Sequence, residues 1–206
     1  MNPRAVLDGL IIRLKKNVDF LNELDRLVGD GDHGTTLERI AQNLSLKKEE
    51  VENYPTLFFK LANSFSSSGG GAASALFSYC FMRVYKLAKK WENSTIFTVE
   101  RLKEITGEFA DSIQRVGRAK VGDKTMLDIW YLFFQWLNSV NSVLLADLPL
   151  FKKLANNKLK NLLEDQKSLV AGAGRASYIG ERTKGKMDPG SASSRMIIQS
   201  FLDAVE

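Results

Sequence analysis

Apolar residues recur at steps of three and four along nearly all of the 206-residue chain. Side chains at that spacing lie on one face of a helix, so the pattern predicts a succession of amphipathic helices. The stripes are, in chain order, Val6, Leu10, Leu14, Val18 and Leu21; Leu57, Leu61 and Phe65; Leu76, Cys80, Val84 and Leu87; Leu102, Ile105, Phe109, Ile113 and Val116; Ile129, Phe133, Trp136, Val140 and Leu144; Leu154, Leu159, Leu162 and Leu169; Ile197, Phe201 and Val205.

Signals for β-strands are almost absent. Residues 95–99 form one weak strand pattern, and the sequence offers it no partner strand. Asn2-Pro3 and Asn53-Tyr54-Pro55, in contrast, are residue types that begin helices. We therefore predict an all-α fold in a single domain over residues 1–206.

Most glycines lie between the predicted helices. Inside a helix, glycine is less favourable than alanine by about 1 kcal/mol. Only Gly9 and Gly107 fall inside predicted helices. In an antiparallel bundle, loops separated by an even number of helices emerge at the same end. The glycine groups therefore predict a pocket lined by backbone at one end of the bundle. These groups are Gly29, Gly31 and Gly34; Gly69, Gly70 and Gly71; Gly117 and Gly122; and Gly172, Gly174, Gly180, Gly185 and Gly190.

Composition narrows the class of protein. Hydrophobic residues make up 44% and charged residues 26%, as in globular proteins. The net charge is +5, but Lys and Arg are scattered in pairs beside acidic or apolar residues, which favours solvated helix faces over a nucleic-acid surface. No apolar run reaches the roughly 18 residues of a membrane span. The lone Cys80, expected in the core, excludes an internal disulfide, and we expect a cytoplasmic protein.

Three carboxylates, Asp25, Asp30 and Asp32, lie within eight positions of a glycine-containing segment. Two such charges about 4 Å apart repel by roughly 4 kcal/mol at an effective dielectric constant near 20, so the cluster favours a counter-ion. Carboxylate oxygens on a tight turn suit Mg²⁺ or Ca²⁺, and the spacing does not match a calcium-binding EF-hand loop. The alternative is a turn whose acids face water. His33 is the only histidine and by itself makes neither a zinc site nor a catalytic triad.

Three further segments could bind an anion. Residues 66–74 (Ser-Ser-Ser-Gly-Gly-Gly-Ala-Ala-Ser) open an apolar helix, and free N–H groups at a helix start attract phosphate. The segment is not a P-loop, because no Gly-Lys-Ser/Thr follows, and it could be merely a flexible turn. Residues 117–128 form a loop that enters a helix near Lys124. Residues 174–182 carry Arg175 and Arg182, which either meet phosphate or are ordinary surface arginines.

Together these segments resemble the nucleotide-binding subunit, or L-type domain, of dihydroxyacetone kinases. The matching strings occur in the family's order and spacing across nearly the whole chain. This resemblance implies an antiparallel barrel or bundle of about eight helices with a nucleotide pocket at one end. The strings are Gly29-Asp30-Gly31-Asp32-His33-Gly34, Gly122-Asp123-Lys124-Thr125-Met126 with Asp128 and Trp130, and Gly174 through Arg182 with Asp188-Pro189-Gly190.

The resemblance also implies a site and an activity. Mg²⁺ would be bound by Asp25, Asp30 and Asp32. ADP would remain bound as a cofactor, a phosphohistidine carrier (M-type) subunit would convert it to ATP, and dihydroxyacetone on a K-type subunit would receive the phosphoryl group. No residue of this chain would be modified covalently. The implied nucleotide contacts are His33, Gly34, Thr35, Thr36, Gly70, Gly71, Ala72, Ala73, Gly117, Thr125, Met126, Arg175, Asp188, Pro189 and Gly190.

The chain departs from the family pattern at two places. Ala73 replaces the serine of the Gly-Gly-Ala-Ser turn, a phosphate-binding hydroxyl that Ser74 or Ser68 could supply, and Thr35-Thr36 replaces an Asn/Met-type pair. Alternatives therefore stay open: an ATP-exchanging kinase subunit or a non-catalytic regulatory paralogue. A fatty-acid-kinase-type domain is a third alternative, but it usually has Thr where this chain has His33.

Overall fold

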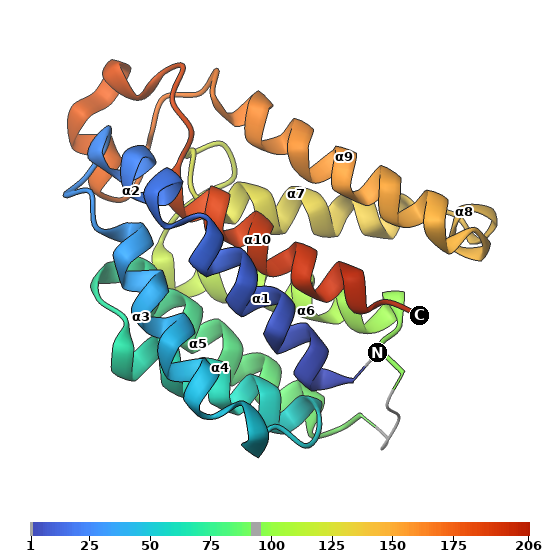
Figure 1. The fold of residues 1–206 in the computed structure, drawn as a ribbon. Helices are drawn as coiled ribbons and strands as arrows, with labels where there is room; N and C mark the ends of the chain where they lie inside the picture. Colours follow the sequence, from blue (N-terminus) through green and yellow to red (C-terminus); the bar gives the residue numbers. More distant parts are fainter. Residues whose placement is uncertain (1, 92–95) are drawn as a thin grey trace.

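The computed structural model describes residues 2–91 and 96–206, and it confirms the all-α prediction for them (Figure 1). Eight α-helices have 14 or more residues, and α2 and α8 are shorter. The helices are α1 (Pro3–Lys16), α2 (Val18–Arg26), α3 (His33–Leu46), α4 (Tyr54–Ser68), α5 (Gly71–Ala88), α6 (Val99–Gly117), α7 (Met126–Ser139), α8 (Ser142–Ala146), α9 (Leu148–Gln166) and α10 (Pro189–Ala204), with 3₁₀ segments η1 (Lys48–Glu50) and η2 (Arg175–Thr183).

Two helices begin where the sequence predicts. The side chain of Asn2 accepts a hydrogen bond from the backbone N–H of Arg4 at 2.9 Å, and that of Asn53 accepts one from the N–H of Thr56 at 2.9 Å. In both helices a proline lies in the first turn, where its missing N–H leaves no acceptor unpaired. Local capping chemistry thus determines these starts.

Other boundaries differ from the predicted stripes. The stripe from Val6 to Leu21 is interrupted at Asn17, whose φ of −115° separates α1 from α2. A second stripe is interrupted at Val140, which is extended and ends α7, so that Leu144 lies in α8. Apolar side chains on both sides of each break face the same core, and hydrophobic spacing alone therefore does not reveal the break.

The weak strand pattern at residues 95–99 does not form a sheet. Phe97 makes an isolated parallel bridge with Val205, and the backbone N–H of Glu206 donates to the Phe97 carbonyl at 2.9 Å. Val99 already belongs to α6, and Thr95 lies outside the described residues.

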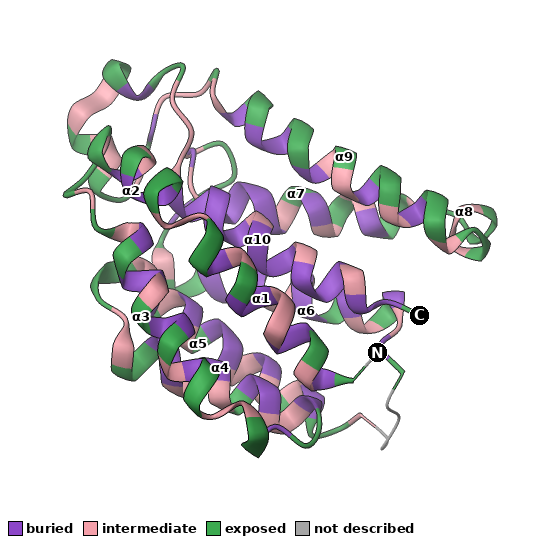
Figure 2. Cartoon of the chain, in the orientation of Figure 1, coloured by how far each residue is buried: buried purple, intermediate pink, exposed green. Residues whose placement is uncertain are grey.

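Sequential helices pack as neighbours, and α10 lies in the middle of the bundle. α4 packs on α5, α5 on α6 and α6 on α7, whereas α10 contacts α1, α7 and α9 (Figure 1). Of the 16 residues of α10, 13 are buried (Figure 2). Its first half is rich in small residues, which allow neighbouring helices to approach closely on several sides.

An aromatic series links successive helices through the core. The ring centroids of Phe65 and Phe81 lie 5.3 Å apart, those of Phe81 and Phe109 5.0 Å, and those of Phe109 and Trp130 4.0 Å. The Trp130 indole donates to the Ser194 hydroxyl of α10 at 2.9 Å, which satisfies its buried N–H. Cys80 is fully buried beside this series, as expected for a core residue. Within the described part of the chain, no helix is both long and apolar enough to cross a membrane.

Candidate metal and phosphate site

The three predicted aspartates converge around the connection between α2 and α3. One carboxylate oxygen from each of Asp25, Asp30 and Asp32 can be chosen so that all three lie within 4.8 Å of one another. Asp25 is buried in the last turn of α2, and the other two are exposed. The backbone N–H groups of Gly31 and Asp32 donate to Asp25 Oδ2 at 2.8 and 3.0 Å, and they hold the loop against the helix end.

Two glycines are required by this loop. A Cβ atom at Gly29 would lie 2.5 Å from Asp25 Oδ1, so a larger residue would displace the carboxylate. Gly31 has a φ of +79°, a backbone conformation that L side chains rarely adopt. The glycines therefore serve to gather the aspartates.

The donor set suits a hard divalent cation. Three carboxylates at this separation repel one another, and oxygen-only ligands are those preferred by Mg²⁺. The Arg175 guanidinium, 2.5 Å from Asp30 Oδ2, compensates part of the negative charge and holds the pKa of Asp30 below its usual value. The carboxylates that face one another across this loop therefore fit a magnesium ion.

Arg175 joins this loop to the turn between α4 and α5. Its Nη2 lies 3.4 Å from the position of a Cβ at Gly71, which has a φ of +70°. Gly70 is the N-cap of α5 and offers no side chain to its free N–H groups. The turn thus presents open backbone donors beside an arginine, which is an arrangement suited to phosphate.

Ala73 lacks the hydroxyl of the family pattern, and the neighbouring serines differ in their exposure. Ala72 is exposed and Ala73 half-buried in the first turn of α5, whereas Ser74 is 5% exposed. The Ser74 side chain packs against Gly69, at which a Cβ would lie 2.6 Å from Ser74 Oγ. Ser68 is half-buried, with its hydroxyl 3.5 Å from that of Ser67.

His33, the first residue of α3, contacts the start of α10. Its Nε2 lies 3.0 Å from Ser193 Oγ, and Ser193 Oγ donates to the Gly190 carbonyl at 3.0 Å. Burial lowers the pKa of His33 and favours the neutral ring. His33 therefore connects two of the predicted nucleotide-binding segments.

The two threonines after Gly34 are already bonded within the protein. The Thr35 N–H donates to Asn22 Oδ1 and its hydroxyl accepts from Asn22 Nδ2, both at 3.0 Å. The Thr36 hydroxyl is buried and accepts from Arg39 at 3.0 Å. Thr35 thus fastens α3 to α2, whereas the Thr36 bond lies within α3, and the sequence predicts neither contact.

The loop before α7 is fixed by a buried lysine, which sequence reasoning did not select. Lys124 has a φ of +56° and is 3% exposed. Its ammonium group donates to the carbonyls of Lys167, Leu169 and Thr183 at 3.3, 2.9 and 2.6 Å. Burial lowers the pKa of Lys124. The three acceptors are backbone atoms, and no residue-type pattern in the sequence identifies them.

Thr125 and Met126 lie at the start of α7, which has a capping box formed by Thr125 and Asp128. The Thr125 N–H donates to Asp128 Oδ2 at 2.8 Å, while the Thr125 side chain caps the helix. Met126 Cε lies 3.1 Å from the position of a Cβ at Gly190, which brings the starts of α7 and α10 together. Gly117, at the end of α6, lies beside Leu76 of α5.

Asp188 is the N-cap of α10 and precedes Pro189 and Gly190. Its Oδ2 accepts from the Ser191 N–H at 2.7 Å. Burial, together with the nearby charge of Asp128, raises the pKa of Asp188 to about 6. The acid of this cap is therefore far less acidic than an exposed aspartate.

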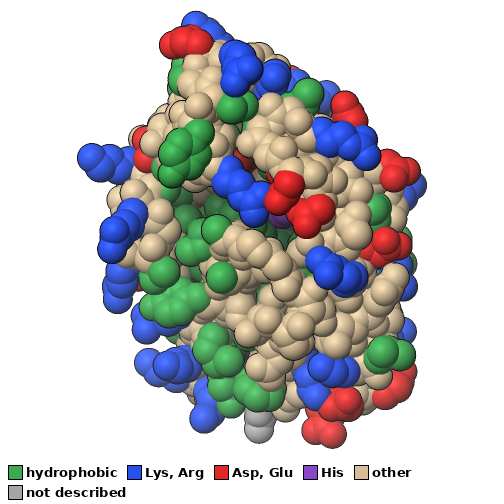
Figure 3. Space-filling view, turned by 90° about the vertical axis from the view of Figure 1, so that its left-hand side faces the viewer, with side chains coloured by type: hydrophobic (Ala, Val, Ile, Leu, Met, Phe, Trp, Pro, Cys, Tyr) green, Lys and Arg blue, Asp and Glu red, His purple; other side chains and the backbone are tan. Residues whose placement is uncertain are grey.

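The four glycine-rich connections meet at one end of the bundle, as the sequence predicts. Arg175 joins the fourth connection to the first and second, and the Gly172 N–H donates to the Asp123 carbonyl of the third at 2.9 Å. Figure 3 views this end, where acidic and basic side chains adjoin on a hollowed face and the single histidine shows behind them. The predicted residues are brought together, and their contacts with a nucleotide remain a prediction.

Comparison with known proteins identifies the family. The DAK2 domain model matches residues 27–203. The ADP-binding subunit DhaL of the PTS-dependent dihydroxyacetone kinase of Lactococcus lactis is 32% identical over 94% of this chain and 91% of its own. The corresponding subunit of the PEP-dependent kinase of Escherichia coli is 30% identical over 88% of this chain and 85% of its own.

A solved structure shares the fold. The dihydroxyacetone kinase of C. freundii superposes with a TM-score of 0.71 at 22% identity, covering 98% of this chain and 34% of that one. The same kinase in complex with AMP-PNP and Mg²⁺ superposes with a TM-score of 0.68. Because the family model matches most of its length and a relative is more than 30% identical to it, the chain belongs to the DAK2-domain family of dihydroxyacetone kinase subunits.

Proposed function

We propose that this protein is the nucleotide-binding subunit of a dihydroxyacetone kinase, with Mg²⁺–ADP retained as a cofactor that is cyclically phosphorylated to ATP. The observation that carries the proposal is the group of three carboxylates within 4.8 Å, beside Arg175 and an open glycine turn. The relative from Lactococcus lactis, whose name specifies an ADP-binding subunit, aligns over 94% of this chain.

Asp25, Asp30 and Asp32 would hold the metal, which when bound supplies positive charge to the phosphates. The backbone N–H groups after Gly70 would bind phosphate oxygens, and Arg175 would exchange its contact with Asp30 for one with phosphate. Positioning and fixed charge are the main contributions that a protein makes to phosphoryl transfer. No covalent residue is needed on this chain.

The remaining contacts would surround the rest of the nucleotide. Met126 and Gly190 already adjoin, and His33 is bonded to the same helix start through Ser193. These contacts suit a nucleotide held between the starts of α3, α5, α7 and α10. The proposed contact residues are His33, Gly34, Thr35, Thr36, Gly70, Gly71, Ala72, Ala73, Gly117, Thr125, Met126, Arg175, Asp188, Pro189 and Gly190.

The proposed partners are a K-type subunit that carries dihydroxyacetone and an M-type phosphohistidine carrier subunit. The cytoplasm is the proposed location, since the lone buried Cys80 suits a reducing compartment. Substrate and carrier would both approach the hollowed end seen in Figure 3, where the carboxylates of Asp30 and Asp32 are exposed.

The test begins with freshly purified protein, which is passed through gel filtration and then denatured to release any nucleotide. We expect about one ADP per chain, and we expect the intact protein to support phosphoenolpyruvate-driven phosphorylation of dihydroxyacetone when mixed with K-type and M-type subunits. An empty protein that turns over only with added ATP would instead identify an ATP-exchanging kinase subunit. Partner binding without turnover would identify a regulatory paralogue.

A further inference from the structure

A cavity of about 480 Å³ lies between α1, α2, α9 and α10, and none of its lining residues belongs to the metal and phosphate site. Its volume is in the range of small-molecule sites. Among the described residues that line it are three cationic side chains, those of Arg13, Lys16 and Arg195, and no acidic one. Apolar side chains supply part of the remaining wall, among them Phe20, Leu163 and Met196.

The side chain of Arg195 is neither hydrogen-bonded nor ion-paired to any residue that the structure describes. Its Nε is buried and has no acceptor among those residues. Arg118 and Arg182 also lack such partners, but both are exposed to water, whereas Arg195 is half-buried. Glu164 is near enough to act on Arg195 through its charge, but its carboxylate is paired with Lys167 at 2.7 Å. A half-buried guanidinium without an anion is costly.

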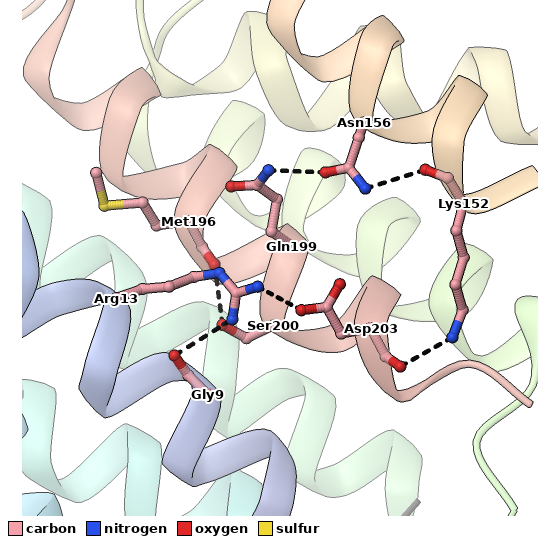
Figure 4. Close-up of polar contacts among 8 residues, drawn as sticks. All are labelled: Gly9, Arg13, Lys152, Asn156, Met196, Gln199, Ser200 and Asp203. Carbon is pink, nitrogen blue, oxygen red and sulfur yellow. Dashed lines mark hydrogen bonds and ion pairs between the residues drawn. The ribbon is translucent and has the colours of Figure 1, made fainter. Parts of the chain in front are cut away.

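The other two cations that line the cavity, Arg13 and Lys16, differ in how they are paired. Arg13 on α1 is held by Asp203, by the Gly9 carbonyl at 3.3 Å and by the Ser200 hydroxyl at 3.5 Å, so its position is fixed (Figure 4). Lys16 is exposed and has no ion pair among the residues that the structure describes. Asp203 neutralises the charge of Arg13. The charges of Lys16 and Arg195 remain, so the net charge around the cavity is about +2.

We propose that this cavity binds an organic phosphate monoester, with the dianionic phosphate between Arg195 and Lys16 and the body of the ligand against Phe20, Leu163 and Met196. Arginine offers paired N–H donors that match phosphate oxygens, and lysine adds a mobile charge at the rim. The charge balance favours a dianion over a monocarboxylate. The apolar wall favours an ester over inorganic phosphate.

The test uses the full chain saturated with Mg²⁺–ADP, so that the probes do not report from the first site. Phenyl phosphate and inorganic phosphate are titrated separately while amide chemical shifts are followed by NMR. We expect saturable shifts at residues 13–20 and 187–199, with phenyl phosphate binding several-fold more tightly. Absence of saturable shifts there would overturn the proposal. Shifts at residues 25–36 on adding Mg²⁺–ADP report separately on the proposed function.

Substitutions then test the role of Arg195. Arg195→Gln should weaken phenyl phosphate binding at least tenfold, whereas Arg182→Gln, at an exposed arginine without a partner, should leave it unchanged. Lys16→Gln should weaken binding less than Arg195→Gln, and Lys15→Gln, whose Nζ contacts Ser45 at 3.4 Å, should have no effect. Binding that is as tight in Arg195→Gln as in the unaltered chain would overturn the proposal.

Thermal unfolding without ligand distinguishes a binding role from a structural one. Arg195→Met should have a Tm equal to or above that of the unaltered chain, because it removes an uncompensated cation. Phenyl phosphate should raise the Tm of the unaltered chain and not that of Arg195→Met. A Tm that falls in Arg195→Met, with the phenyl phosphate shift retained, would show that Arg195 only supports the fold.

Discussion

Gly34 lies where the first turn of α3 meets the backbone of α2. A Cβ atom at this position would lie 2.0 Å from the Val18 carbonyl oxygen and 2.8 Å from its carbon. Space, and not backbone conformation, therefore requires glycine here. The residue fixes the distance between the helix that ends with the Asp25 turn and the helix that begins at His33.

We predict that Gly34→Ala lowers the free energy of unfolding by about 2 to 3 kcal/mol, because backbone must move to admit the methyl group. Urea unfolding measures the change. Gly70→Ala is the matched control, since nothing lies within 4 Å of its added Cβ and its φ of −146° suits any residue. Equal unfolding midpoints for the two variants would contradict this account of Gly34.

Asp188 makes the stability of the nucleotide-free protein depend on pH. Its pKa of about 6 in the fold exceeds the ordinary 3.8, so folding favours the protonated acid. The resulting stabilisation is complete below about pH 4 and is lost as pH rises through 6. Between pH 4 and pH 7, the free energy of unfolding of the unaltered chain should therefore fall by up to about 3 kcal/mol relative to that of Asp188→Asn. Urea unfolding of both proteins across this range checks the difference, and parallel pH profiles would refute it.

At the scale of residues, the sequence indicated site residues only where they lie close together along the chain. Asp25, Asp30 and Asp32 are close in sequence, and their glycine spacing indicates a shared turn. Asn22 and Ser193 give no such signal, because their partners Thr35 and His33 lie 13 and 160 positions away. Their hydrogen bonds depend on how the helices pack, and the sequence pattern does not report that packing.

At the scale of elements, Lys124 acts as a clamp between connections. Its three carbonyl acceptors belong to the chain that leaves α9 and to the end of η2, the segment that begins with Arg175. The Gly185 N–H also donates to the Lys167 carbonyl, one of these three acceptors, at 2.7 Å. Lys124 therefore holds the Arg175 segment against the start of α7.

We expect Lys124→Met to lower the free energy of unfolding by about 3 kcal/mol, since buried carbonyls would lose their donor. Hydrogen exchange should accelerate at the amides of Ala171, Gly172 and Gly185, while the amides of α4 and α5 stay protected. Lys184→Met, an exposed lysine in the same connection, provides the control and should match the unaltered chain. Unchanged exchange at these amides in Lys124→Met would rule out the clamp.

Helices were predictable as elements because each buries an apolar face, and two starts were predictable from their asparagine and proline caps. The breaks at Asn17 and Val140 were not, since the apolar spacing continues across them. Gly34, which the sequence analysis places between helices, lies in the first turn of α3. Helix ends there are set by tertiary contacts that a local pattern does not contain.

For the whole molecule, alternation of helix direction predicted that the glycine-rich connections meet at one end, and the contacts of Arg175 with Asp30 and Gly71 bear this out. The sequence did not predict that α10 lies in the middle of the bundle. Nor did it predict the cavity beside Arg195, because cavities depend on the packing of distant helices.

The central claim is that the aspartate group binds a divalent ion together with a diphosphate. Asp32 suits the test because its exposed carboxylate accepts no hydrogen bond within the described structure, so Asp32→Asn removes charge and little else. Asp111→Asn, at an exposed carboxylate on α6 paired with Arg115, is the control.

Calorimetric titration of nucleotide-stripped protein with ADP, with and without Mg²⁺, measures the claim directly. We predict that Mg²⁺ strengthens ADP binding to the unaltered chain and to Asp111→Asn. In Asp32→Asn, ADP affinity in the presence of Mg²⁺ should fall by roughly tenfold or more. An ADP affinity that is independent of Mg²⁺, or that is equal in all three proteins, would contradict the assignment.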